Sequence, residues 1–272
     1  MSTPQPLTDS SALTANRARA NKDDLFLHVA AMDELQDRLQ SVNRTFTAPA
    51  VVNGYSNFWG NQIPNAVSVA DTDLLELDQN AHDLVIHAMS LHWANDPVGQ
   101  IIQCKRALQN DGLFLAVCFG GQTLHELRAC LGQAEIEIMG GLSPRIAPMA
   151  ELRDMGGLLQ RAGLALPVAD VANLNVTYRD IWHLMHDLRA MGETNALMSR
   201  QRKATPRAVF ERANTLYCET FPAKDGGITA TFDLLFLAGW APDDSQPKPL
   251  RPGSAAQRLA DALGTQENPL SD

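Results

Sequence analysis

The strongest constraint on the fold is a strand–helix–strand pattern between residues 83 and 119. Two apolar runs, Asp83–His87 and Leu113–Phe119, are typical of strands covered on both faces of a parallel sheet. Between them, Asn95 and Asp96 precede Pro97, which is the arrangement of a capping residue before the first turn of a helix. A helix that joins two parallel strands makes a right-handed βαβ unit, so the pattern predicts an α/β sheet.

Further elements extend this unit in both directions. Apolar spacing predicts helices over about residues 24–42, 97–108, 123–138, 152–162, 181–191 and 206–219, and strands over 48–52, 66–70, 167–178 and 228–240. Thr123 and Glu126 form the pattern of a capping box at the start of the third helix. The last strand is expected to be antiparallel. The predicted fold is α/β, a Rossmann-like doubly wound sheet with appended helices.

The length and the polarity of the two ends indicate one domain. Residues 1–22 are polar and predicted to be a mobile N-terminus. Residues 23–241 are expected to form a single domain. Residues 242–272 are predicted to be a polar, proline-rich tail with one short helix over 255–263.

Composition excludes several classes of protein. The 22 Lys and Arg residues against 31 Asp and Glu give a net charge of −9, and a negative protein is repelled by nucleic acid and by anionic membranes. No run of about 18 apolar residues is present, so no transmembrane segment is predicted. The four cysteines are interpreted as reduced thiols, and the protein is expected to be cytoplasmic. The spacing of the histidines predicts no metal site.

Motifs in the middle of the chain resemble a known family. Asp83-Leu84-Val85 is followed by Ser90-Leu91-His92-Trp93 and Asp96, and a later Asn110-Asp111-Gly112 precedes an apolar strand. This pattern is similar to class I S-adenosylmethionine-dependent methyltransferases, in the branch of the malonyl-carrier-protein O-methyltransferases of biotin synthesis and a mitochondrial complex I assembly factor. Downstream motifs resemble the assembly-factor side of that branch: Phe119-Gly120-Gly121, Gly140-Gly141 with Ser143-Pro144, Met191-Gly192-Glu193 with Asn195, and Gly239-Trp240.

The front of the chain departs from the family pattern. A methyltransferase of this class carries a glycine-rich turn after its first strand, where the backbone approaches the cofactor without a Cβ in the way. The corresponding stretch here, Val51–Gly60, keeps Gly54 and Gly60 and contains no acidic residue. The distance from Val51 to Asp83 is also too short for the strands and helices that the family places there. The N-terminal half is therefore predicted to be shortened by about one βα unit.

The resemblance assigns candidate site residues. Residues expected to line S-adenosylmethionine are Gly54, Asp71, His87, Ala88, Met89 and Ser90. Residues expected on the substrate side are Leu91, Trp93, Gly121 and Ser143, with helical elements over residues 142–225. His92 and Arg145 are the catalytic candidates, and Arg145 could pair with a carboxylate or phosphate. For the histidines the alternative is a buried, hydrogen-bonded side chain, and for Trp93 it is packing at the sheet edge.

Two functions remain open. The resemblance implies a methyltransferase that transfers a methyl group to a small-molecule or protein acceptor, or an arginine hydroxylase of the assembly-factor type. The alternative is a non-catalytic assembly or binding protein that keeps the fold and has lost S-adenosylmethionine binding. The incomplete glycine turn favours the second, and the intact loop around His92 favours an occupied ligand site.

Overall fold

The computed structural model describes residues 5–224, 226–247, 261 and 264–265. The chain divides into two compact units, Met1–Pro242 and Asp243–Asp272. The sheet lies in the first unit. The helix expected over residues 255–263 falls outside the described residues, except for Asp261.

Six strands form one mixed sheet in the order β2-β1-β3-β4-β6-β5. Strands β2, β1, β3 and β4 are parallel, and β6 is antiparallel to both β4 and β5. The bounds are Pro49–Asn53 for β1, Val67–Ala70 for β2, His82–Ala88 for β3, Leu108–Gly120 for β4, Ala165–Tyr178 for β5 and Ile228–Trp240 for β6. The α/β class and the antiparallel last strand are therefore confirmed.

The predicted shortening at the front of the sheet is also confirmed. Along the sequence, only one strand, β2, follows β1 before β3 begins. The connection from β1 to β2 holds the four-residue helix α3 (Ser56–Trp59). A full βα unit needs a helix of about 11 residues, which this stretch does not accommodate. The carboxyl ends of β1 and β2, which carry Gly54 and Asp71, still lie side by side.

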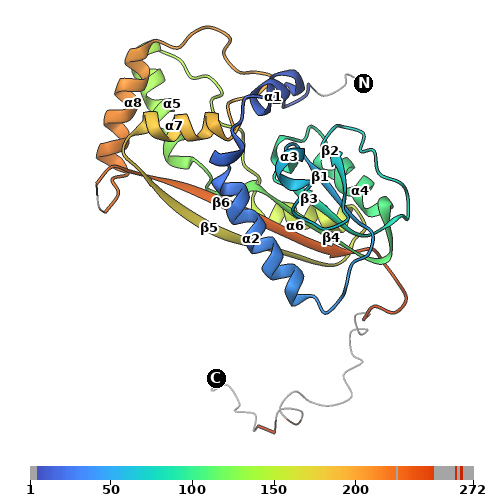
Figure 1. Cartoon of the computed structure of the whole chain (residues 1–272). Coiled ribbons are helices and arrows are strands. Elements are labelled where there is room, and N and C mark those ends of the chain that lie inside the picture. The colour runs from blue at the N-terminus through green and yellow to red at the C-terminus, as the bar shows by residue number, and fades with distance from the viewer. Residues whose placement is uncertain (1–4, 225, 248–260, 262–263, 266–272) are drawn as a thin grey trace. The chain divides into compact units, whose positions relative to one another are not determined.

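Helices cover both faces of the sheet, as alternating strand residues require. On one face, Leu84 and Ile86 pack with residues of α2 (Phe26–Ser41), α5 (His125–Met139), α7 (Ile181–Ala190) and α8 (Arg207–Thr220). On the other face, Val85 packs with residues of α4 (Pro97–Ala107) and α6 (Leu152–Arg161). Helices α5, α7 and α8 gather at one end of the long β5–β6 ribbon (Figure 1). The sheet is thus doubly wound, as predicted.

The start of α5 differs from the predicted capping box. Leu124 precedes the helix in the left-handed region (φ 55°), and no side chain caps it. Thr123 Oγ1 donates to the carbonyl of Gly120, and Glu126 accepts from the backbone N–H and the hydroxyl of Thr231 on β6. Both side chains therefore bind the sheet, which a local capping pattern does not reveal. By contrast, Asp96 caps α4 as expected, through the N–H of Gly99.

The N-terminal segment also differs from the expected mobile stretch of residues 1–22. It contains helix α1 (Ser10–Arg17), which is capped by Asp9. The Asp9 N–H donates to the Ala196 carbonyl, and Leu13 is buried against Trp93, Ala147 and Leu197. The polar sequence was misleading because one apolar side chain and several long-range hydrogen bonds hold this segment.

Candidate functional site

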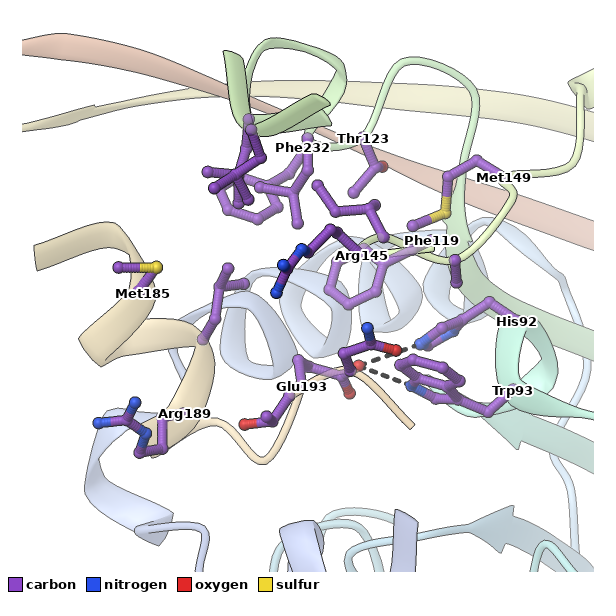
Figure 2. Close-up of a pocket in the computed structure, with 18 of the residues that line it drawn as sticks. His92, Trp93, Phe119, Thr123, Arg145, Met149, Met185, Arg189, Glu193 and Phe232 are labelled. Atoms are coloured by element: carbon purple, nitrogen blue, oxygen red, sulfur yellow. Dashed lines mark hydrogen bonds and ion pairs between the residues drawn. The ribbon is translucent and has the colours of Figure 1, made fainter. Parts of the chain in front are cut away.

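A cavity of about 230 Å³ opens beside the end of β3 and β4. Its walls are mostly apolar and come from the ends of β4 and β6, from α5 and α7, and from the segment after α7 (Figure 2). The polar residues at its lining include His92, Trp93, Arg145 and Glu193. A largely apolar pocket with a few convergent polar groups is the usual form of a small-ligand site.

Glu193 provides the buried charge of this site. Its carboxylate accepts hydrogen bonds from Trp93 Nε1 at 2.7 Å and from His92 Nε2 at 3.3 Å (Figure 2). Burial alone raises the pKa of Glu193, but the hydrogen bond from His92, the charge of Arg17 and the hydrogen bond from Trp93 lower the pKa to about 2. Glu193 is therefore a carboxylate at neutral pH, held by donors from the loop after β3.

His92 lies on the short 3₁₀ helix η2 (Leu91–Trp93), which follows β3. Its side chain is only 4% exposed, and its ring packs edge-on against Phe119 with centroids 4.9 Å apart. Because a carboxylate can only accept, the contact with Glu193 requires the proton on Nε2. Nδ1 is buried and has no partner among the described residues, and in the neutral ring it is an acceptor.

Arg145 lines the cavity, but its head group is already paired. Its guanidinium lies 2.6 Å from Glu135 Oε1, and the Ser143 N–H and hydroxyl donate to the same carboxylate. Burial raises the pKa of Glu135, and the Arg145 and Ser143 hydrogen bonds bring the pKa below its usual value. The structure therefore places Arg145 and Ser143 in the anchoring of the loop after α5.

The other predicted substrate-side residues lie away from the cavity lining. Leu91 is buried with the α4 and α6 residues on the opposite face of the sheet. Gly121 adopts a left-handed conformation (φ 52°), and a Cβ built there would lie 2.4 Å from Asp233 Oδ2. Of the predicted residues, the structure brings His92, Trp93 and Arg145 together.

Two of the six predicted cofactor residues line a second cavity, of about 440 Å³, at the ends of β1 and β2. Gly54 and Asp71 line it. His87, Ala88, Met89 and Ser90 are instead buried at the end of β3 and do not line it. His87 Nε2 lies 2.7 Å from the side-chain oxygen of Gln100, whose amide nitrogen donates to the carbonyls of Asp71 and Thr72.

The residues around this second cavity do not fit S-adenosylmethionine. A Cβ built on Gly54 would lie 2.3 Å from Arg17 Cζ, so the space that this glycine leaves open contains the Arg17 guanidinium. Arg17 Nη1 is 2.8 Å from both oxygens of Asp71, and both side chains are nearly buried. The turn itself is filled by Tyr55 and Trp59, which are buried. No catalytic step through the cofactor follows from this arrangement.

Two residues of these sites were not assigned from the sequence. Glu193 belongs to Met191-Gly192-Glu193, which was noted only as a family motif, and its partners lie 100 positions or more earlier in the chain. Arg17 lies in a segment predicted to be mobile. A lone acidic or basic residue in a polar stretch carries no local signal of a long-range ion pair.

The described residues contain neither a cluster of three potential metal ligands nor a helix that is long and apolar enough to cross a membrane. The four cysteines are free, with Cys104, Cys118 and Cys130 buried and Cys218 exposed.

Sequence comparison with known proteins identifies relatives. The chain is 36% identical over 220 residues to "Arginine-hydroxylase NDUFAF5, mitochondrial" of Danio rerio, a match that covers 81% of this chain and 68% of the relative. The human protein of that name is 36% identical over 79% of this chain and 62% of its own length. A malonyl-[acyl-carrier protein] O-methyltransferase of Laribacter hongkongensis is 33% identical over 65% of this chain and 57% of its own. The chain thus spans about two thirds or less of the length of these relatives.

The fold and these relatives define a protein of the class I methyltransferase fold. Within that class, the chain belongs to the family that includes the NDUFAF5 arginine-hydroxylases and the malonyl-[acyl-carrier protein] O-methyltransferases. No family model matches the chain. Among solved structures, the Bacillus protein YcgJ matches with a TM-score of 0.48 at 12% identity, over 77% of this chain and 98% of that chain, which is too low to support an inference.

The expectation of a cytoplasmic protein is wrong. The NDUFAF5 relatives, from four vertebrate species and from Dictyostelium discoideum, are all named as mitochondrial proteins, and this points to mitochondria.

Proposed function

We propose that the protein is a binding protein of the assembly-factor branch that takes a donor-rich side chain, foremost an arginine, into the cavity beside His92 and Glu193. The observation that carries the proposal is the buried Nδ1 of His92, which has no partner among the described residues, at a largely apolar cavity. A buried acceptor without a partner is unfavourable by about 1–3 kcal/mol, so a guest that donates to it gains that free energy on binding.

The shape of the lining limits the guest. Apolar side chains such as Leu127, Met149 and Phe232 form the walls, so the body of the guest is apolar. The polar residues at the lining include His92, whose Nδ1 has no partner among the described residues, and Glu193, so the head of the guest is one that donates hydrogen bonds. An arginine side chain combines an apolar stem with a head that only donates. The word "arginine-hydroxylase" in the names of the relatives is consistent with such a guest.

The proposal concerns binding and does not include methyl transfer. A second candidate, methyl transfer to a small-molecule or protein acceptor, is favoured by the family and by His92 Nδ1, which could accept a proton from an acceptor group. It requires S-adenosylmethionine, and the position of Arg17 beside Gly54 opposes that requirement. Binding of a side chain by the cavity requires no cofactor.

The indole N–H of Trp93, which donates to Glu193, is a suitable probe of the cavity. Its nitrogen–proton NMR signal is assigned by its loss in Trp93→Phe. Titration with acetyl-arginine amide is expected to shift this signal, with an affinity roughly tenfold above that for acetyl-norleucine amide, because only the arginine side chain donates hydrogen bonds. A parallel titration with acetyl-citrulline amide, whose side chain donates hydrogen bonds but is uncharged, distinguishes the effect of hydrogen-bond donation from that of charge.

The variant His92→Phe removes the acceptor and keeps a ring against Phe119. It is expected to reduce the preference for the arginine compound, because only the Glu193 carboxylate then remains to accept from the guest. His183→Phe, at an exposed histidine that contacts Asp180, is the matched control and should leave the preference intact. Equal binding of both compounds by the unmodified protein, or no change of the Trp93 signal at millimolar concentration, contradicts the proposal.

A further inference from the structure

The ends of β1 and β2 form a site whose occupant comes from the chain itself. Arg17, the last residue of α1, lies between Gly54 and Asp71, although it is 54 positions before Asp71 in the sequence. Its side chain is 9% exposed, and that of Asp71 is 12% exposed. A buried ion pair at this depth persists only where the surrounding groups hold it in good geometry.

Two neighbouring groups attract the Arg17 guanidinium. Asp71 provides the opposite charge at 2.8 Å, and the ring of Tyr55 lies under the guanidinium, with its centroid 5.4 Å from Cζ. A cation over an aromatic face is attracted by the ring quadrupole. Gly54 has no Cβ, which would lie 2.3 Å from Cζ, so only glycine at this position admits the planar group.

Hydrogen bonds from a side chain of α4 hold the loop that carries Asp71. Gln100 donates to the carbonyls of Asp71 and Thr72, and its own oxygen contacts the buried His87. On the neighbouring strand, Asn53 donates to Ser68 and accepts from the N–H of Tyr55. These contacts fix the Asp71 carboxylate and the Tyr55 ring independently of the group that binds between them.

The helix that delivers Arg17 is also fixed. Asn16 donates to the carbonyl of Thr194, and the N–H of Asn21 donates to the carbonyl of Ala190. Gly192, in a left-handed conformation (φ 77°), passes so close that a Cβ there would lie 3.1 Å from Arg17 Cα. Contacts on both sides of Arg17 therefore hold it in the site as part of the folded core.

We propose that the site which holds the cofactor in this fold is, in this chain, a guanidinium-binding site that Arg17 occupies as an internal ligand in place of S-adenosylmethionine. The site recognises a planar cation through Asp71, Tyr55 and the open space at Gly54. Its lining residues differ from those of the cavity at His92 and Glu193, and the inference does not depend on what that cavity binds.

The proposal predicts chemical rescue by free guanidinium compounds. Only Nη1 of Arg17 reaches Asp71, and Nε and Nη2 are buried without a partner among the described residues. In Arg17→Ala an untethered ethylguanidinium ion can turn two nitrogens to the carboxylate. Millimolar ethylguanidinium is expected to raise the melting temperature of Arg17→Ala by roughly 2–4 °C more than it raises that of the unmodified protein.

Three controls make the test specific. Ethylammonium has the same charge without the planar group and is expected to rescue less. Arg207→Ala, at an arginine whose side chain is 84% exposed, should show no rescue. Arg17→Ala combined with Asp71→Asn removes the unpaired carboxylate, so this double variant is expected to melt above the single variant and to lose the response to ethylguanidinium. If the single variant does not fold, recovery of folding in the double variant supports the ion pair.

Two results overturn the proposal. One is that ethylguanidinium shifts Arg17→Ala no more than Arg207→Ala. The other is that Arg17→Ala, or the double variant where the single one does not fold, binds S-adenosylhomocysteine with a micromolar Kd, because the site is then a working nucleoside site that Arg17 only covers. Neither result depends on the arginine and norleucine titrations of the other cavity, so failure of one proposal is distinguishable from failure of the other.

Discussion

His92 donates its Nε2 proton to Glu193 across 101 positions of sequence, and both side chains are at most 5% exposed. This pair joins the loop after β3 to the segment after α7. It places a carboxylate that is ionised at neutral pH at the end of an apolar cavity.

The pH dependence of stability is the first test of this pair. The pKa of Glu193 falls from its ordinary value of 4.5 to about 2 in the folded protein. A lowered acid pKa contributes stability above the unfolded value, and that contribution is lost as pH falls from about 4.5 towards 2. Glu193→Gln is expected to lower the free energy of unfolding by roughly 3 kcal/mol at pH 7 and to differ little from the unmodified protein near pH 2. Urea denaturation at several pH values measures this, and parallel stability curves would exclude it.

His28 is expected to titrate far below an ordinary histidine. Trp59 Nε1 donates to His28 Nδ1 at 3.0 Å, and burial lowers the pKa of His28 from 6.5 to about 4, despite the opposing charge of Glu193. Because the folded state favours the neutral ring, the contribution of His28 to the free energy of unfolding is complete above about pH 6.5. This contribution is lost as pH falls towards 4. NMR titration of the His28 ring should give a midpoint near 4. A midpoint near 6.5 would show that the ring is accessible to water.

Substitutions at two glycines distinguish the effect of steric contact on stability from the effect of backbone strain. Gly192 (φ 77°) and Gly140 (φ 70°) are both left-handed, but a Cβ on Gly192 would lie 2.7 Å from the Tyr55 hydroxyl, whereas Gly140 has nothing within 4 Å. Gly140→Ala should be destabilising by about 1 kcal/mol, through strain alone. Gly192→Ala should be worse by at least a further 1 kcal/mol or so, because the N-terminal segment and Tyr55 must move. Equal loss in both variants would mean that the N-terminal segment does not pack as described.

Asp83, the first residue of a family motif, has a structural role. Its carboxylate accepts from the N–H groups of Thr47 and Ala48, and these hydrogen bonds lower its pKa against the effect of burial. Asp83→Ala is expected to lower the free energy of unfolding by about 1–3 kcal/mol, since the buried Asp83 carboxylate and its hydrogen bonds to two backbone N–H groups are lost. Asp73→Ala, at an exposed acid, is the control, and an equally small effect of both substitutions would contradict this role.

The sequence patterns predicted the fold more completely than the site. Apolar runs such as those around Val85 and Phe114 are local, and their order along the chain limits the sheet to few arrangements. The missed helix α1 offers only Leu13 to the core, so periodicity could not reveal it.

The site depended on pairings that no local pattern contains. His92 and Trp93 were found because they follow a strand, where ligands bind in such sheets. Glu193 and Arg17 were missed because their partners, His92 and Asp71, lie 101 and 54 positions away. Arg145 is a ligand-binding candidate because the resemblance places its loop on the substrate side, whereas in the structure Glu135 neutralises it.

Whether Arg17 has replaced the cofactor is tested most directly by calorimetric titration of S-adenosylhomocysteine into the unmodified 272-residue chain. Because the Arg17 guanidinium lies against Gly54 and is paired with Asp71, no binding is expected at concentrations up to the millimolar range. A low-micromolar Kd would contradict the replacement of the cofactor by Arg17 and would mean that this chain still binds the cofactor.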